Sequence, residues 1–205
     1  MLNAISLFRD NIKEIRRLEG LFNYISTTIV TPLPLEDILR SQHVYAVSAF
    51  DKLMHDLIRK GMVEVYLGKR AATKKYSAEG ISLEIHKSLM EAQKNPLPPA
   101  EIIFEQALFN KFKQASFQEP LKVAEGLSYV WDEAQKWQKI SGSMGMDEAT
   151  VKTTLKLIVD RRNSIVHEAD INPSTNLKFQ IIQADCITTT NFIEKCGLEI
   201  ANLVK

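Results

Sequence analysis

Residues 161–170 read RRNSIVHEAD, and they close a long amphipathic segment of the chain. Asp147 precedes this segment in the position of a helix N-cap, and Pro173 follows it where a helix would stop. We therefore predict a helix from about 148 to 169. Two arginines, an asparagine, a histidine and two acidic residues fall within its last turns. Whatever chemistry the protein performs, we expect it at this helix end.

Apolar residues recur at helical spacing along most of the remaining chain. The spacing predicts further helices over about 2–28, 35–67, 82–94, 102–112, 121–140 and 185–204. Short connections between these helices favour an all-α bundle of about seven helices that forms a single domain over residues 1–205.

The segments between the helices carry turn and break signals. Prolines predict breaks at 31–34 and 95–99, and glycines predict a flexible turn at 141–145. Residues 69–80 form a basic, polar connection. Residues 176–182 alternate like a strand but have no evident partner, so we expect an extended packing segment there, or at most a short strand.

Composition excludes several classes of protein. Hydrophobic residues make up 45% and charged residues 25% of the 205 residues, as in an ordinary globular domain. The net charge of +1 gives no overall field that would attract nucleic acid or a membrane. No apolar run reaches membrane-spanning length, and the charged residues 1–20 lack a signal-peptide core.

The two cysteines point to a reducing compartment. Cys186 and Cys196 lie ten residues apart in the same predicted helix, so they cannot bridge each other, and they lack zinc-ligand spacing. We expect a reduced, cytoplasmic protein. No cluster of metal ligands and no glycine-rich phosphate loop is visible, so we expect neither a metal nor a cofactor.

Arg162 lies on the apolar stripe of the motif helix. It follows Leu155 by seven residues, which places it on the face that is expected to contact the core. An arginine on that face must pair or meet an anionic partner, because burying it alone is costly. The apolar residues that define this stripe are Val151, Leu155, Ile158 and Ile165.

Asn163, His167 and Asp170 share the adjoining flank, at positions i, i+4 and i+7. The helix dipole favours cations at this end, which helps to place Arg162 and biases His167 towards its protonated form. Asp170 either orients His167 or is simply a helix-end acid. A structural arginine paired with a neighbouring carboxylate would give the same pattern, so this geometry alone leaves chemistry and structure both open.

Asp51 and His55 lie one turn apart in the predicted helix 35–67, with Arg59 one turn further on. They form either a charge ladder on a solvated face or a support for the motif. In the second interpretation Asp51 is the buried counter-ion of Arg162, and His55 lies at the rim of the site.

The connection at 69–80 carries the local positive charge, with Tyr66 and Tyr76 on either side of it. It is either a solvated loop or a strip that holds the RNA backbone, where the two tyrosines would stack on unpaired bases. Its basic residues are Lys69, Arg70, Lys74 and Lys75. His43 and His86 look incidental, and Trp131 and Trp137 are expected to pack in the bundle.

The sequence resembles the HEPN superfamily, and most closely its RiboL-PSP-HEPN branch. Residues 162–167, RNSIVH, match the Arg-x4–6-His signature, including the polar residue after the arginine. Residues 41–57, SQHVYAVSAFDKLMHDL, resemble the branch's long early helix, with a small-residue run, an aspartate and then a histidine. Residues 69–145 match nothing specific to the family.

The resemblance implies a helical bundle that dimerises and brings two Arg/His motifs into one composite site. Active members are metal-independent RNA endonucleases, often toxins or effectors of antiviral defence. Other members only bind nucleotides or partners. The intact motif favours the active class, with RNA as substrate, a homodimer, and an antitoxin or defence protein as a further partner.

RNA cleavage without a metal assigns a role to each motif residue. His167 has the intrinsic pKa of a general base or acid, and Arg162 can hold the phosphate and its developing charge. Asn163 would orient either group, and Arg161 would contact the RNA together with the basic connection. The expected products are a 2′,3′-cyclic phosphate and a 5′-hydroxyl. A silent module that binds nucleotide, RNA or protein, and a purely structural or antitoxin-like partner, are the alternatives.

Overall fold

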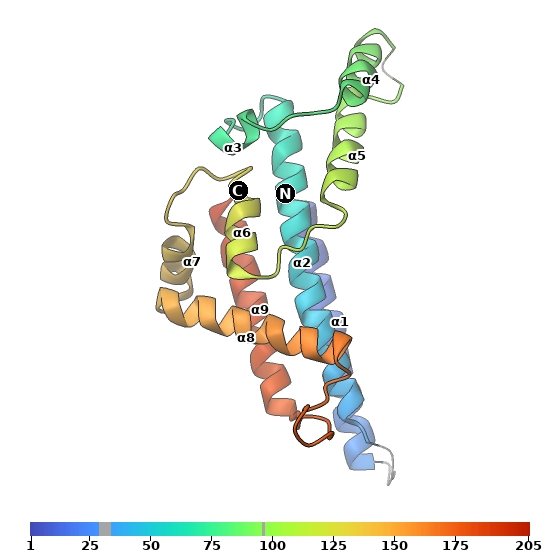
Figure 1. Ribbon diagram of the computed structural model, residues 1–205, viewed down its shortest axis with the longest axis vertical. Coiled ribbons are helices and arrows are strands. Elements are labelled where there is room, and N and C mark those ends of the chain that lie inside the picture. The colour runs from blue at the N-terminus through green and yellow to red at the C-terminus, as the bar shows by residue number, and fades with distance from the viewer. Residues whose placement is uncertain (29–33, 96) are drawn as a thin grey trace.

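The computed structural model describes residues 1–28, 34–95 and 97–205. Within these residues the chain is all-α (Figure 1), with one isolated bridge between Ile171 and Lys178 as its only β-type pairing. The helices are α1 (Leu2–Thr28), α2 (Glu36–Tyr66), α3 (Lys74–Ser77), α4 (Leu83–Lys94), α5 (Ala100–Phe112), α6 (Pro120–Leu127), α7 (Lys136–Met144), α8 (Glu148–His167) and α9 (Gln183–Leu203).

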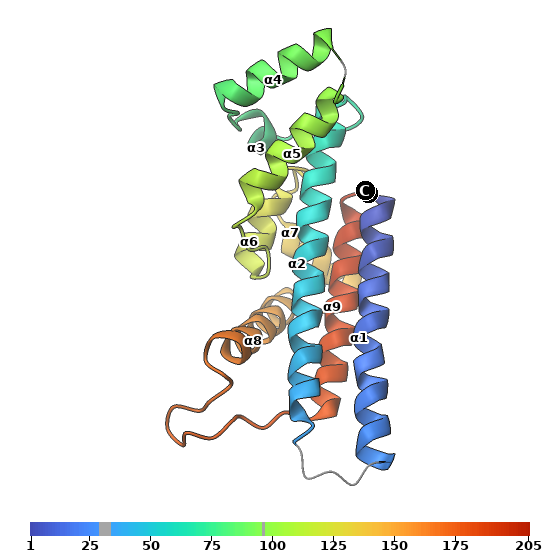
Figure 2. The same ribbon diagram turned by 90° about the vertical axis from the view of Figure 1, so that its right-hand side faces the viewer.

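Three long helices form the central column of the molecule. α1, α2 and α9 lie side by side in both views (Figures 1 and 2), and their apolar faces meet in one continuous core. Gly197 allows α9 to approach closely, because a Cβ there would lie 2.8 Å from the Phe8 ring and 3.0 Å from Leu53 Cδ2. A larger residue at this position would push the column apart.

α8 crosses this column (Figure 1) and buries the first half of its apolar stripe. Asp147 caps the helix as predicted, since its carboxylate accepts a hydrogen bond from Thr150 N at 2.8 Å. Leu155 and Ile158 are buried, as expected. Ile165 was predicted to be buried and is only half-buried. None of the residues from 160 to 169 is fully buried. The motif end of α8 therefore lies at the edge of the fold.

Two differences from the sequence-based prediction raise the number of helices. The single helix predicted at 121–140 is two helices, α6 and α7, and the predicted flexible turn at 141–145 is mostly the end of α7. A tertiary contact lies at this break: Thr73 Oγ1 is 2.8 Å from Ser128 O and 3.1 Å from Tyr129 O, directly after the end of α6.

The connection at 69–80 contains the second difference, the one-turn helix α3. Thr73 also caps this helix, because its hydroxyl accepts a hydrogen bond from Tyr76 N at 3.0 Å. The breaks predicted at 31–34 and 95–99 fall partly on residues 31–33 and 96, which lie outside the described residues; α2 and α5 begin shortly after them.

α8 ends at His167, two residues earlier than predicted. Ala169 (φ 53°) and Asp170 (φ 60°) adopt left-handed backbone conformations that turn the chain away from the helix axis. After them a turn at 173–175 and a bend at 176–177 bring Lys178 back to Ile171 in an antiparallel bridge, and Phe179 N donates to Asp170 O at 2.8 Å. The strand-like pattern near 176–182 thus corresponds to this short pairing.

Both cysteines are free, as expected from their spacing, and both are buried. Burial raises the pKa of the Cys196 thiol to about 12, and that of Cys186 to about 11. These thiols therefore stay protonated at neutral pH and act as small apolar core residues. None of the described helices has the length and apolar character that a membrane crossing requires.

Leu155 and Leu157 provide a matched test of how α8 packs. Leu155 is 0% exposed and Leu157 is 63% exposed on the same helix. We expect Leu155→Ala to lower the free energy of unfolding by about 2–5 kcal/mol, because it leaves a cavity in the core. Leu157→Ala should change it by less than about 0.5 kcal/mol. Urea denaturation of both variants measures the difference, and equal losses would show that α8 packs in another phase.

Candidate active site

The motif residues lie on the last two turns of α8. Arg162 and Asn163 are half-buried, and Arg162 NH1 donates a hydrogen bond to Asn163 Oδ1 at 2.9 Å. Arg162 Nε is buried, and it has no partner among the residues that the structure describes. The guanidinium is therefore held on one side by the neutral amide of Asn163.

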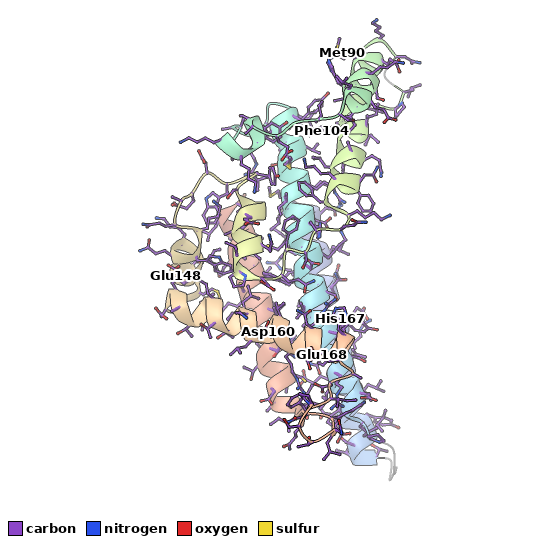
Figure 3. All side chains as sticks on the ribbon, in the orientation of Figure 1. Met90, Phe104, Glu148, Asp160, His167 and Glu168 are labelled. Atoms are coloured by element: carbon purple, nitrogen blue, oxygen red, sulfur yellow. The ribbon has the colours of Figure 1, made fainter. Side chains whose placement is uncertain are left out.

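His167 is exposed at the C-terminal end of α8 (Figure 3). Asn163 precedes it by one turn on the same face, whereas Arg162 precedes it by five residues and projects about 140° away. None of the described side chains bonds to its imidazole. His167 is thus accessible to a ligand, but α8 alone does not point Arg162 and His167 at one atom.

Asp170 is the buried charge of this region, with 0% of the residue exposed. Its Oδ2 accepts from Arg40 Nε at 2.7 Å and from Arg161 NH2 at 2.9 Å, and Arg161 NH1 lies 2.7 Å from Oδ1. Asp170 therefore neither orients His167 nor acts as a simple solvated helix-end acid, the two interpretations that the sequence allowed. Its left-handed backbone turns the carboxylate inward, to the two arginines.

Arg40 and Arg161 tie three parts of the chain together. Arg40, from α2, also donates to Phe179 O at 2.8 Å and to Asp37 at 3.1 Å. Arg161, from α8, also donates to Gln180 O at 3.2 Å. The cluster formed by Arg40, Asp170 and Arg161 joins α2, α8 and the segment that follows α8. Arg161 was predicted to contact RNA, but its guanidinium is engaged in this cluster.

His43 belongs to the same region and was wrongly considered incidental. It is buried on α2, one turn after Arg40, and its Nε2 lies 2.9 Å from Ile158 O on α8. Burial lowers the pKa of the imidazole, so the neutral ring donates this bond near neutral pH. From the sequence alone, neither Arg40 nor His43 was assigned a role. Their spacing of one turn beside the apolar stripe of α2, next to the buried Leu39, was the available signal.

The sequence of the chain matches a known protein family. The model of the RiboL-PSP-HEPN family matches residues 9–205, which include both α2 and the motif end of α8. The chain belongs to this family. Comparisons with curated proteins and with solved structures found no match. HEPN domains are helical and are generally ribonucleases, which is consistent with the all-α fold described above.

Asp51 and His55 of the HEPN domain anchor a loop rather than the motif. Asp51 Oδ1 accepts from Phe117 N at 2.7 Å, and its Oδ2 accepts from Gln118 Nε2 at 3.0 Å. His55 Nε2 lies 3.1 Å from Ala115 O, and its ring packs edge-on against Phe117. Of the two interpretations of these residues, support of the motif does not hold, because Asp51 bonds this loop and not Arg162; both residues instead fix the α5–α6 connection on α2.

The basic connection lies at the far end of α2 from the cluster around Asp170 (Figures 1 and 2). His43 and Tyr66 are 23 residues apart on one helix, or about 35 Å along its axis. Arg70 pairs with Glu64 at 3.1 Å, and Lys75 donates to Glu125 O at 2.9 Å, while Lys69 and Lys74 are exposed. One protomer does not bring these residues to the motif, and RNA binding by them stays a prediction.

Among the described residues, no group of three or more His, Cys, Asp or Glu side chains is arranged to hold a metal ion. The titratable groups that surround the motif are instead Asp170 and its arginines. The chemistry available at this helix end is that of one exposed imidazole, one half-buried guanidinium and one amide.

Asp170 and Asp160 provide a matched pair of acidic residues. Asp170→Asn keeps the size and the left-handed backbone preference but leaves Arg40 and Arg161 without a counter-charge. We expect a loss of about 3–5 kcal/mol of unfolding free energy, as for other broken buried ion pairs. Asp160→Asn removes only an exposed pair with Lys156 at 3.0 Å, which is worth about 0–1 kcal/mol. Chemical denaturation of both variants measures the contrast, and losses of similar size would contradict the proposed importance of Asp170.

Proposed function

We propose that this HEPN domain is a metal-independent endoribonuclease whose site consists of Arg162, Asn163 and His167. The observation that carries the proposal is that one helix end holds both an accessible imidazole and a guanidinium that no described carboxylate neutralises. In a helical domain whose family generally consists of ribonucleases, these are the groups that an RNA phosphate requires.

The reaction uses the substrate's own nucleophile. His167 removes the proton of a ribose 2′-hydroxyl, and the 2′-oxygen attacks the adjacent phosphorus. Arg162 stabilises the charge that develops on the phosphorane oxygens, and Asn163 holds the guanidinium in place. The bond to the 5′-oxygen then breaks, and that oxygen takes a proton from an acid. The products are a 2′,3′-cyclic phosphate and a 5′-hydroxyl.

A second copy of the chain completes this site. Arg162 and His167 project about 140° apart on one helix, so a phosphate held by one is poorly placed for the other. Val166, which lies between them on α8, is 45% exposed. A symmetric dimer that apposes the two α8 ends covers this edge and sets Arg162 of one protomer against the imidazole of its partner, which gives two equivalent sites.

The first test is cleavage of single-stranded RNA by the purified protein, with and without EDTA. We expect cleavage in both conditions, with cyclic-phosphate ends. His167→Ala should abolish cleavage. Arg162→Lys should retain little cleavage activity, because lysine lacks the bidentate fork. DNA of the same sequence should not be cleaved, since it lacks the 2′-hydroxyl.

His86→Ala is the control for this test, because His86 is an exposed histidine on the distant helix α4. It should cleave like the wild type. Cleavage that persists in His167→Ala, or that requires magnesium, would rule out the mechanism. Binding of RNA or nucleotide without cleavage would instead support the silent HEPN module. Its function would then lie in binding, with a toxin, antitoxin or defence protein as the partner.

The second test is complementation between two inactive variants. Arg162→Ala and His167→Ala protein are mixed in equal amounts and allowed to exchange subunits. If the site takes its arginine and its imidazole from different protomers, the mixture should regain about a quarter of wild-type activity, because half of the dimers are mixed and each holds one intact site out of two. Two residues acting within one protomer would give no recovery, and light scattering that shows a monomer would exclude the dimer.

A further inference from the structure

Phe179 is an aromatic residue whose backbone is held firmly while its ring is left partly open. Phe179 N donates to Asp170 O at 2.8 Å, and Phe179 O accepts from Arg40 NH2 at 2.8 Å. The side chain is nevertheless 37% exposed. Burying a phenylalanine side chain fully contributes about 1.5–3 kcal/mol to stability, and this position forgoes part of that gain.

One face of the ring is backed by a cation. The guanidinium carbon of Arg161 lies 5.3 Å from the centroid of the Phe179 ring. Arg161 is in turn fixed by Asp170, so the guanidinium cannot easily leave the ring. Phe179 is thus a flat surface supported from behind, with its backbone and its backing both attached to the cluster of Arg40, Asp170 and Arg161.

The ring lies close to the proposed catalytic residues. Asp170, which bonds the Phe179 backbone, follows His167 by three residues, and its own N–H donates to Ser164 O at 3.0 Å in the last turn of α8. A groove of about 450 Å³ opens beside Phe179, between the start of α2 and residues 178–182. Phe179 is therefore within a nucleotide's reach of the motif.

The charged side chains of this groove balance in number, two acidic and two basic, so they give a phosphate no net attraction. Glu36 and Asp37 line it, and a hydrogen bond from Lys178 lowers the pKa of Asp37, so that this carboxylate stays ionised. Arg40 and Lys178 line the groove as well, and both already donate to Asp37, at 3.1 and 2.9 Å. The two cations and the two acids therefore offset each other, whereas a nucleobase is uncharged, flat and able to donate from its amino group to an acid. The rest of the lining around Phe179 is apolar or amide in character, with Pro34, Ile181, Ile182 and Gln180.

We propose that Phe179 is the stacking platform for an unpaired base of the RNA whose phosphate is bound by Arg162 and His167. This inference rests on the proposed function and adds the substrate class: RNA with an unpaired nucleotide next to the scissile phosphate. Only a base that has left its own stack can lie on the ring, so a continuous duplex is excluded from the site.

Binding is measured separately from cleavage by using single-stranded 2′-O-methyl RNA of about twelve nucleotides, whose blocked 2′-oxygen cannot attack. Fluorescence anisotropy gives the affinity, and a 2-aminopurine placed at successive positions reports stacking through loss of its fluorescence. The proteins compared are the wild type, Phe179→Ala, Phe179→Leu and Phe179→Trp. Leu177→Ala, a change at a 69% exposed residue of the same segment, is the matched control.

We expect Phe179→Ala and Phe179→Leu to bind about 5- to 100-fold more weakly, which is the effect of removing one base–aromatic stack. Phe179→Trp and Leu177→Ala should bind like the wild type. One 2-aminopurine position should be quenched by the wild type and not by Phe179→Ala. Thermal melts of all variants show whether the fold is kept.

Wild-type affinity in Phe179→Leu would overturn the platform, since leucine keeps the apolar bulk but not the flat face. The same loss with duplex RNA would also overturn it, as would a loss of dimerisation in place of RNA affinity. Stacking on Phe179 without cleavage of unmodified RNA refutes the nuclease alone. Cleavage by His167 with an unchanged KM in Phe179→Ala refutes the platform alone, and a wild type that binds no RNA refutes both.

Discussion

The candidate site depends on one interaction, the pairing of the buried Asp170 carboxylate with Arg40 and Arg161. A carboxylate without solvent is costly, and here Arg40 from α2 and Arg161 from α8 offset that cost from two sides. Because the pairing requires Asp170 to point inward, the chain must leave the helical path just before it, in a left-handed conformation. The end of α8, and with it the exposure of His167, follows from this one buried charge.

The same cluster separates two adjacent arginines into different roles. Arg161 and Arg162 are neighbours in sequence and about 100° apart on the helix. Arg161 reaches Asp170 and is used for structure, whereas Arg162 bonds only the neutral amide of Asn163 among the described residues. A local excess of positive charge therefore stays at the motif, although the chain as a whole carries a net charge of only +1. Specific geometry, rather than net charge, prepares this helix end for an anion.

Apolar contacts anchor α8 in the core, whereas its exposed C-terminal end is held by polar contacts. Val151, Leu155 and Val159 anchor the helix in the core, and polar contacts hold its C-terminal part: His43 on α2 bonds Ile158 O, and Arg161 bonds Asp170, which Arg40 on α2 also holds. Hydrogen bonds and ion pairs are directional, so they can fix a helix end at the molecular edge without covering it with apolar side chains. This arrangement keeps the motif ordered and accessible at once.

The sequence by itself determined what depends on local pattern. The spans of α1, α2, α8 and α9, the Asp147 cap and the burial of Leu155 follow from interactions within a few residues, which periodicity and capping rules describe. The position of the Arg162–His167 motif at a helix end was predictable for the same reason.

Only the tertiary structure decided the partners of the polar groups. Thr73 bonds Ser128 at the end of α6 from 55 residues away, Asp51 bonds Phe117 and Gln118 instead of Arg162, and Arg40 meets Asp170 across 130 residues. One-dimensional spacing shows that a side chain faces inward, but a charge pairs with whichever group the packing of other helices brings within about 3 Å, and that distance is set by the whole fold.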